Sequence, residues 1–243
     1  ARRAPVGDPC AFPVPATPLA PGPTRGRLGD AQARFNSTAL ARDDPAGIVE
    51  RSRLARLFTS KGVPPALLAA IADWVDADST TRADGAEDDV YAQASPPSLA
   101  ANAPLIRTAE ITAVRGVNAR TFAAVAPFVI ALPVTTALNV NTATAEPLSA
   151  ALTDLYSEAL TGLLAERARA PFTSLADFRS RLPQGVAFAN EATFRVSSSY
   201  FMVTVNSRQG DAVAQARALL KREGRDNPTV VWQTLSSRPP VPL

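Results

Sequence analysis

Histidine is absent from this sequence of 243 residues, and cysteine and methionine each occur only once. Without histidine, neither a Ser-His-Asp triad nor a Cys-His dyad can form, and most zinc sites lose a usual ligand. The single cysteine, Cys10, permits no internal disulfide. No apolar run reaches the roughly 18 residues that a membrane-spanning helix needs. The composition therefore excludes these nucleophilic mechanisms and a disulfide framework.

Lysine is scarce as well, since Lys61 and Lys221 are the only lysines among 25 basic residues. The net charge of +3 and the pI of about 9.5 are too weak a signal to require nucleic-acid binding. Hydrophobic residues make up 46% of the chain, which suits a folded protein. Because the only methionine is Met202, we expect Ala1 not to be a natural start and a targeting segment to have been removed.

The first segment, residues 1–24, contains seven prolines. Proline fixes φ and has no backbone donor, so neither a long helix nor a central strand is expected there. The pattern predicts an extended lead-in that leaves Cys10 exposed as a thiol without a role. A short strand is expected to follow within residues 25–35.

Two further parts follow from a change in hydrophobic period. From residue 44 to residue 190 the apolar residues recur at helical spacing, with helices expected at 44–61, from 64, and at 109–115, 119–131, 144–152, 155–168 and 174–182. After about residue 193 the period becomes 2, which predicts a meander of strands. The sequence therefore predicts an α+β fold: a small antiparallel sheet from 25–43 and 191–243, interrupted by an all-helical insertion at 44–190.

An acidic segment at residues 73–89 stands out within the helical part. Clustered carboxylates repel one another, and the repulsion grows as they leave water. Hard carboxylate oxygens on a flexible loop are the ligands that Ca²⁺ prefers, although the spacing is not that of an EF-hand. A solvated acidic loop explains the composition equally well, and a glycosidase-type carboxylate pair is a third alternative. The acids are Asp73, Asp76, Asp78, Asp84, Glu87, Asp88 and Asp89.

Glycine and asparagine turns between the predicted helices suggest a rival function. The stretch 111–119 reads as helix, Gly116 turn and helix, with Asn118 as a cap of the second helix. Thr153 to Ser157 joins another pair. Such units resemble helix-hairpin-helix modules that hold DNA phosphates, so nucleic-acid binding is the alternative function. The first turn lacks a second glycine and the second turn carries Asp154, which argues against it.

Several segments taken together resemble one protein family, the K-type minor pseudopilins (GspK) of bacterial type II secretion. GDAQARFN at 29–36 is similar to the family's "D-x-x-x-RFN" strand, and 72–91 to its "DW-x-DAD…GAED-x-x-Y" segment. PPSLAANAP at 96–104 resembles "PP-x-x-x-AN-x-P", and residues 109–116 resemble "SEL-x-x-VRG". LPVTTALNVNTA at 132–143 resembles "ALP…LNVNTA". Residues 1–25 do not resemble the family's N-terminal hydrophobic helix.

The resemblance implies a non-enzymatic structural subunit at the tip of the periplasmic pseudopilus. It implies I-type and J-type minor pseudopilins as partners, with the major pseudopilin filament below them, and no nucleic acid. It also implies an inner-membrane anchor through an N-terminal helix absent from this chain. Two structural calcium ions are expected, with ligands carried over to Asp73, Asp76, Asp78, Glu87, Asp88 and Asp89. A head enlarged by the insertion should block a further subunit above it, so we expect the last position in the filament.

Overall fold

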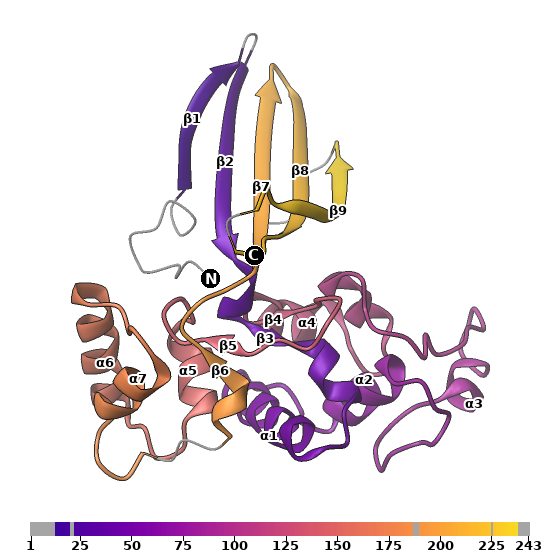
Figure 1. Cartoon of the computed structure of the whole chain (residues 1–243). Helices are drawn as coiled ribbons and strands as arrows, with labels where there is room; N and C mark the ends of the chain where they lie inside the picture. The colour runs from indigo at the N-terminus through magenta and orange to yellow at the C-terminus, as the bar shows by residue number, and fades with distance from the viewer. Residues whose placement is uncertain (1–12, 20–21, 187–189, 225, 238–243) are drawn as a thin grey trace.

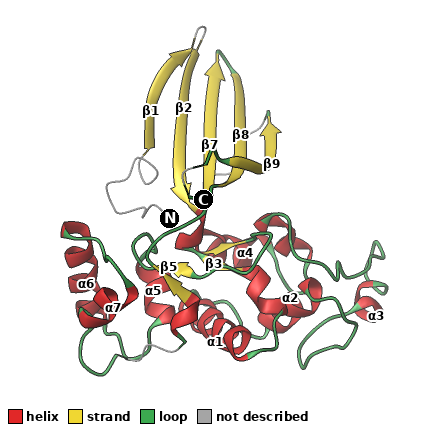
Figure 2. Cartoon of the chain, in the orientation of Figure 1, coloured by secondary structure: helices red, strands yellow, loops and turns green. Residues whose placement is uncertain are grey.

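The computed structural model describes residues 13–19, 22–186, 190–224 and 226–237. Figures 1 and 2 show two parts: a tall antiparallel sheet, and a broad helical part against one end of it. The strand order is β1-β2-β7-β8-β9. The strands are β1 Pro13–Leu19, β2 Gly22–Asp30, β7 Tyr200–Gln209, β8 Ala212–Lys221 and β9 Thr229–Ser236. The predicted α+β fold with an insertion is confirmed, because the helical part lies between β2 and β7.

The first strand corrects the prediction for residues 1–24. Residues 13–19 form β1, which pairs with β2, so this half of the segment belongs to the sheet. The prolines of β1 are tolerated because β1 is an edge strand, where a missing N–H costs no ladder hydrogen bond. Cys10 lies outside the described residues.

The inserted part is mostly helical. Its α-helices are α1 Pro45–Ser60, α2 Leu67–Val75, α3 Asp88–Tyr91, α4 Ala119–Val125, α5 Ala145–Ala151, α6 Ser157–Arg169 and α7 Leu175–Ser180. The 3-10 helices within the described residues are η2 Ala31–Ala33, η3 Ser37–Ala41, η4 Thr108–Ala113, η5 Ala126–Phe128 and η6 Glu191–Thr193. The start of α1 follows from its sequence, because the side chain of Asp44 accepts from the Gly47 N–H at 2.9 Å and Pro45 occupies the first turn.

The sequence predicted an all-helical insertion, and this prediction is wrong in part. Two pairs of short parallel strands cross it: β3 Phe35–Asn36 with β4 Val129–Ile130, and β5 Leu138–Asn139 with β6 Phe194–Arg195. A helix was expected over 119–131, but α4 ends at Val125 because Pro127 cannot continue it. The short strands instead tie distant parts of the chain together.

The boundaries between the two parts also differ from the prediction. Phe35, Leu40 and Phe194 are buried in the large core of the helical part, whereas Tyr200 and Met202 belong to a smaller core beneath the sheet. The buried side chains of residues 35–43, and Phe194, therefore pack with the insertion and not with the sheet. Period alone could not place them, because these segments are too short to show one.

A hydrogen-bonded junction joins the two parts at the end of β2. Asp30 Oδ2 accepts hydrogen bonds from Asn139 Nδ2 at 2.9 Å, Thr142 Oγ1 at 2.5 Å and Ser198 Oγ at 2.6 Å. Asp30 Oδ1 accepts from the Gln32 N–H at 2.8 Å. These contacts bring the segments 29–36 and 132–143 together. The junction fixes how the sheet stands on the helical part.

The structure does not confirm helix-hairpin-helix units. Asn118 does cap α4 through a capping box with Thr121, and Gly116 takes a positive φ of 80°. The element before that turn, η4, is a 3-10 helix and not an α-helix. In the part of the chain that the structure describes, no helix is long and apolar enough to cross a membrane.

Candidate metal centre

The acidic loop joins α2 to α3, and one carboxylate of α2 holds it in place. Asp73 is fully buried. Its Oδ2 accepts from the backbone N–H groups of Ala86 at 2.9 Å and Arg82 at 3.2 Å. Its Oδ1 accepts from Arg82 Nη1 at 2.8 Å. Asp73 therefore holds the loop in place through its hydrogen bonds to Arg82 and Ala86, which lie late in the loop.

Three other carboxylates converge within this loop. One oxygen each from Asp76, Asp78 and Glu87 lies within 4.8 Å of the other two. Asp76 and Glu87 are buried, while Asp78 is exposed. Asp76 Oδ1 and both carboxylate oxygens of Glu87 are buried and have no hydrogen-bond partner among the described residues. Buried anionic oxygens without donors are what a hard cation such as Ca²⁺ would satisfy.

The electrostatics of the cluster point the same way. Burial, reinforced by the charges of Asp73, Asp76 and Asp78, raises the pKa of Glu87 to about 7. Burial also raises the pKa of Asp76, although Arg82 opposes this rise. The pKa of Asp78 is lowered, because its carboxylate accepts from the Thr80 N–H. The folded loop thus holds negative charge that the protein itself neutralises only in part.

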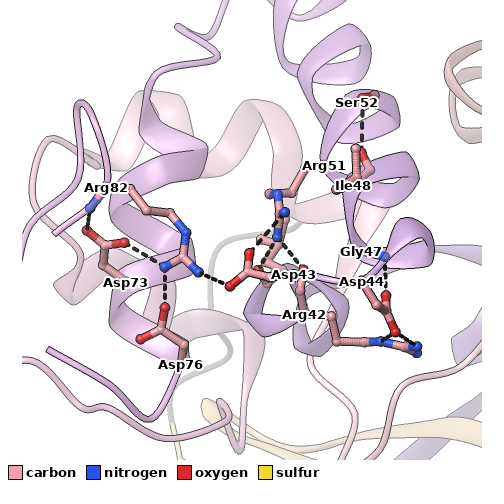
Figure 3. Close-up of polar contacts among 11 residues, drawn as sticks. Arg42, Asp43, Asp44, Gly47, Ile48, Arg51, Ser52, Asp73, Asp76 and Arg82 are labelled. Atoms are coloured by element: carbon pink, nitrogen blue, oxygen red, sulfur yellow. Dashed lines mark hydrogen bonds and ion pairs between the residues drawn. The ribbon is translucent and has the colours of Figure 1, made fainter. Parts of the chain in front are cut away.

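Arg82 is the cation that the protein does supply. Figure 3 shows its guanidinium between Asp73, Asp76 and Asp43, with Asp43 in turn paired to Arg51 of α1. The Asp43 contact is 3.1 Å long. This row of ion pairs fastens the loop to the start of α1. It leaves Asp76 Oδ1 without a hydrogen-bond partner among the described residues.

The six ligand residues expected from the sequence are only partly brought together. Asp76, Asp78 and Glu87 form the cluster, and Asp73 joins it through Arg82. Asp88 lies in the first turn of α3, where its Oδ1 accepts from the Ala100 N–H at 2.8 Å, and Asp89 is exposed beside it. The ligand set therefore stays a prediction.

Sequence reasoning missed three residues of this site: Arg82, Asp43 and Gly85. Arg82 is the one base among the acids of residues 73–89, and Asp43 lies 30 residues or more from the loop in sequence. A tight turn containing Gly85 could have been suspected from the glycine alone. Its contact with Asp73 could not, because that contact depends on how the loop folds back on α2.

Gly85 yields a prediction about the loop. A Cβ at this position would overlap Asp73 Oδ2 and lie 2.9 Å from the carbonyl oxygen of Arg82. Gly85→Ala should therefore destabilise the protein by about 1–3 kcal/mol, the usual cost of overpacking. Urea unfolding followed by circular dichroism measures this. Gly162→Ala in α6 is the matched control, since an added Cβ would meet no atom within 4 Å beyond its chain neighbours and its own helix backbone, and alanine favours a helix. Equal effects at both positions would contradict the predicted close contact.

Comparison with known proteins identifies the family. Two family models described as type II secretion system protein K match this chain, one over residues 33–134 and the other over residues 138–196. The chain belongs to the type II secretion system protein K family. Together the two models span most of the helical part, so the acidic loop lies inside the matched region, whereas Asp30 and Ser198 of the junction lie just outside it. The resemblance inferred from the sequence is confirmed.

Relatives in other bacteria agree with this assignment. Type II secretion system protein K of Klebsiella pneumoniae is 35% identical over 214 residues, which cover 82% of this chain and 65% of that protein. The same protein of Aeromonas hydrophila is 32% identical over 242 residues, covering 90% and 72%. The chain therefore spans about two thirds of the length of these protein K relatives.

A solved structure extends the likeness to the whole fold. A chain in the crystal structure of the GspK-GspI-GspJ complex from the enterotoxigenic Escherichia coli type 2 secretion system matches with a TM-score of 0.83. The two chains are 26% identical, and the match covers 98% of this chain and 88% of that one. Both the sheet and the helical insertion are thus features that this protein K family member shares with that chain.

Proposed function

We propose that this chain is a structural subunit of the type II secretion pseudopilus and that it occupies the filament tip. The observation that carries the proposal is the likeness, over nearly the whole chain, to a chain of the GspK-GspI-GspJ complex. By that likeness its partners are an I-type and a J-type minor pseudopilin. The family resemblance adds a major pseudopilin filament below them. The protein faces the periplasm, held in the inner membrane by an N-terminal helix.

The shape of the molecule supports the tip position. The helical part extends well beyond the width of the sheet on both sides (Figure 1). A filament grows by repeating one head-to-tail contact, and each head must leave room for the next subunit. A head widened in this way blocks the next position, so it suits the end of a filament. The interface with neighbours then lies on the sheet side.

The proposed role requires no catalysis. The sequence has no histidine, and the described clusters of acids contain no nucleophile paired with a base. Glu87 has a pKa in the range of a general base, but its oxygens face two other carboxylates. That arrangement suits a bound cation better than proton transfer.

Calcium is the cation that we propose for the loop. Asp76, Asp78 and Glu87 would hold one ion, and their unpaired buried oxygens fit its preference for hard oxygen ligands. Asp88 and Asp89 at the start of α3 are the candidates for a second ion. When bound, calcium supplies positive charge and fixes the loop, while Asp73 and Arg82 position the loop backbone.

Co-expression tests the proposed assembly. This protein, purified with the I-type and J-type minor pseudopilins of the same bacterium, should elute with them from a size-exclusion column at 1:1:1. Cross-linking in cells should join it to minor pseudopilins near one filament end. Elution apart from both partners, or regular cross-links to the major pseudopilin along the shaft, would contradict the tip assignment.

The raised pKa of Glu87 predicts how calcium binding depends on pH. Without metal, the folded-state pKa of about 7 exceeds the usual value of 4.5, so the folded state binds the proton more tightly. Its contribution to stability is present below pH 4.5 and is lost as the pH rises through 7. Calcium needs the ionised carboxylate, so protons compete with it. The gain in Tm from calcium should therefore shrink between pH 8 and pH 6. Paired melts with calcium and with chelator at each pH measure this, and a constant gain would contradict it.

A further inference from the structure

A basic pocket lies between the sheet and the helical part, on the side of β8 and β9. Its volume is about 660 Å³. One wall comes from residues of β8 and β9, and the other comes mainly from η4 and β4. The pocket is remote in sequence from the acidic loop. The residues that matter for what it can bind are Arg34, Arg217, Trp232, Met202, Ile130 and Thr108.

Arg34 and Arg217 line this pocket, and Arg27 lies near Arg34, whereas the one carboxylate in the lining, Glu110, is paired with Arg107. Arg27 pairs in register with Thr204, and Thr204 with Arg217, so both arginines point from the same face of the sheet. Arg34 follows β2 and lines the pocket. None of the three makes an ion pair or a side-chain hydrogen bond within the described part of the chain. Burial, then the nearness of Arg217 and Arg27, lowers the pKa of the Arg34 guanidinium.

The pocket also offers an unused donor and an apolar floor. The indole Nε1 of Trp232 is buried and donates to no acceptor among the described residues. Met202 and Ile130 lie in the small core beneath the sheet and line the same pocket. A buried donor without a partner costs free energy unless a bound molecule satisfies it. Cationic forks, an N–H donor and apolar surface together suit a peptide with carboxylates better than an inorganic anion.

The edge of the sheet beside the pocket is open. Among the described strands, β9 pairs only with β8, and its sequence TVVWQTLS contains neither proline nor charge. The opposite edge strand, β1, carries Pro13, Pro15 and Pro18. Prolines and charges are the usual protection of an edge strand, so β1 is protected and β9 is not. An extended segment can therefore add to the sheet at β9 only.

We propose that the pocket and the β9 edge together bind an extended acidic segment of a partner protein. The segment adds its backbone to β9 and directs carboxylates to Arg34 and Arg217. In an added strand, every second side chain points to the same face of the sheet. The carboxylates on that face can therefore reach the arginines. The inference goes beyond the proposed function, and it does not require the partner to be an I-type or J-type pseudopilin.

The proposal can be tested by fluorescence anisotropy. The probe is a labelled seven-residue peptide of alternating valine and glutamate, which is titrated with the purified protein in the presence of calcium. The peptide should bind, and the same peptide with lysine for glutamate should not. Arg217→Gln and Arg34→Gln should each weaken binding about tenfold, as expected for a lost charge-assisted hydrogen bond. Trp232→Phe should weaken it about threefold. Arg169→Gln, an equal charge change at the exposed end of α6, should change it less than twofold.

Several outcomes would overturn the inference. They are absence of binding by the acidic peptide, equal losses in Arg217→Gln and Arg169→Gln, and full displacement of the peptide by phosphate at constant ionic strength. Binding to vesicles of anionic lipid that depends on Arg217 would assign the pocket to a membrane instead. N-methylation of alternate peptide nitrogens should abolish binding, and retained affinity would contradict addition at β9. Thermal melts of each variant check that the protein stays folded.

Discussion

Adding calcium to the metal-free protein should raise its Tm by about 5–10 °C. A ligand that binds only the folded state adds about 2.7 kcal/mol at a concentration 100 times its Kd. In a chain of this size, 1 kcal/mol corresponds to roughly 2–4 °C. The physical source is the carboxylate cluster of Asp76, Asp78 and Glu87, whose buried oxygens have no donor in the described protein. Thermal melts with millimolar calcium and with chelator give the measurement.

A variant of the exposed ligand separates calcium binding from folding. Asp78→Ala should reduce the gain in Tm by at least half, with little cost to the metal-free protein, because Asp78 is exposed. Asp211→Ala, which removes an exposed carboxylate at the turn between β7 and β8, should keep the full gain. Magnesium, which demands a tighter octahedral site, should replace calcium poorly. Identical melts with calcium and with chelator would show that the loop is a solvated acidic segment.

Asp30→Ala should be the most damaging single change at the junction, costing roughly 3 kcal/mol of unfolding free energy. The substitution leaves donors of Asn139, Thr142 and Ser198 without their acceptor between the two parts of the molecule. It also removes the acceptor for the Gln32 N–H, and with it the cap of η2. Urea unfolding measured by tryptophan fluorescence gives the free energy.

Asp30→Asn refines the same prediction. The amide keeps one oxygen for the three side-chain donors, but its NH₂ group then faces the Gln32 N–H. Burial raises the pKa of Asp30 despite its four hydrogen bonds, so a neutral replacement saves part of the desolvation cost. We therefore expect a smaller loss for asparagine than for alanine. Asp211→Ala again serves as control, with an effect within about 0.5 kcal/mol. If Asp30→Ala cost no more unfolding free energy than Asp211→Ala, the junction would not be what fixes the sheet on the helical part.

Much of the fold could be predicted because its elements carry strong local signals. Asp44, Pro45 and Gly62 set the limits of α1, since a cap, a first-turn proline and a left-handed glycine act within a few residues. The strands β7 to β9 follow from alternation and turn residues. β1 was missed because prolines argue against a central strand, and only its place at the edge makes them acceptable.

For the candidate site, the sequence supplied the kind of side chain and the tertiary structure decided the geometry. Seven acids within residues 73–89 suggested a cation site because their repulsion needs an offset, but a solvated acidic loop explained the composition equally well. The sequence could not tell that Asp76, Asp78 and Glu87 converge, or that Arg82 takes one oxygen of Asp76. Those facts depend on the path of the loop.

The same division holds for the whole molecule. Period, caps and motifs predicted most helices, the strands β2 and β7 to β9, and the family, because each depends on residues close together in the chain. Only the tertiary structure brought Asp30 to Asn139 and Ser198, and placed Arg34 beside Arg217 at an open strand edge. Contacts across such distances depend on how the two parts pack. Packing is a property of the whole chain that no local pattern contains.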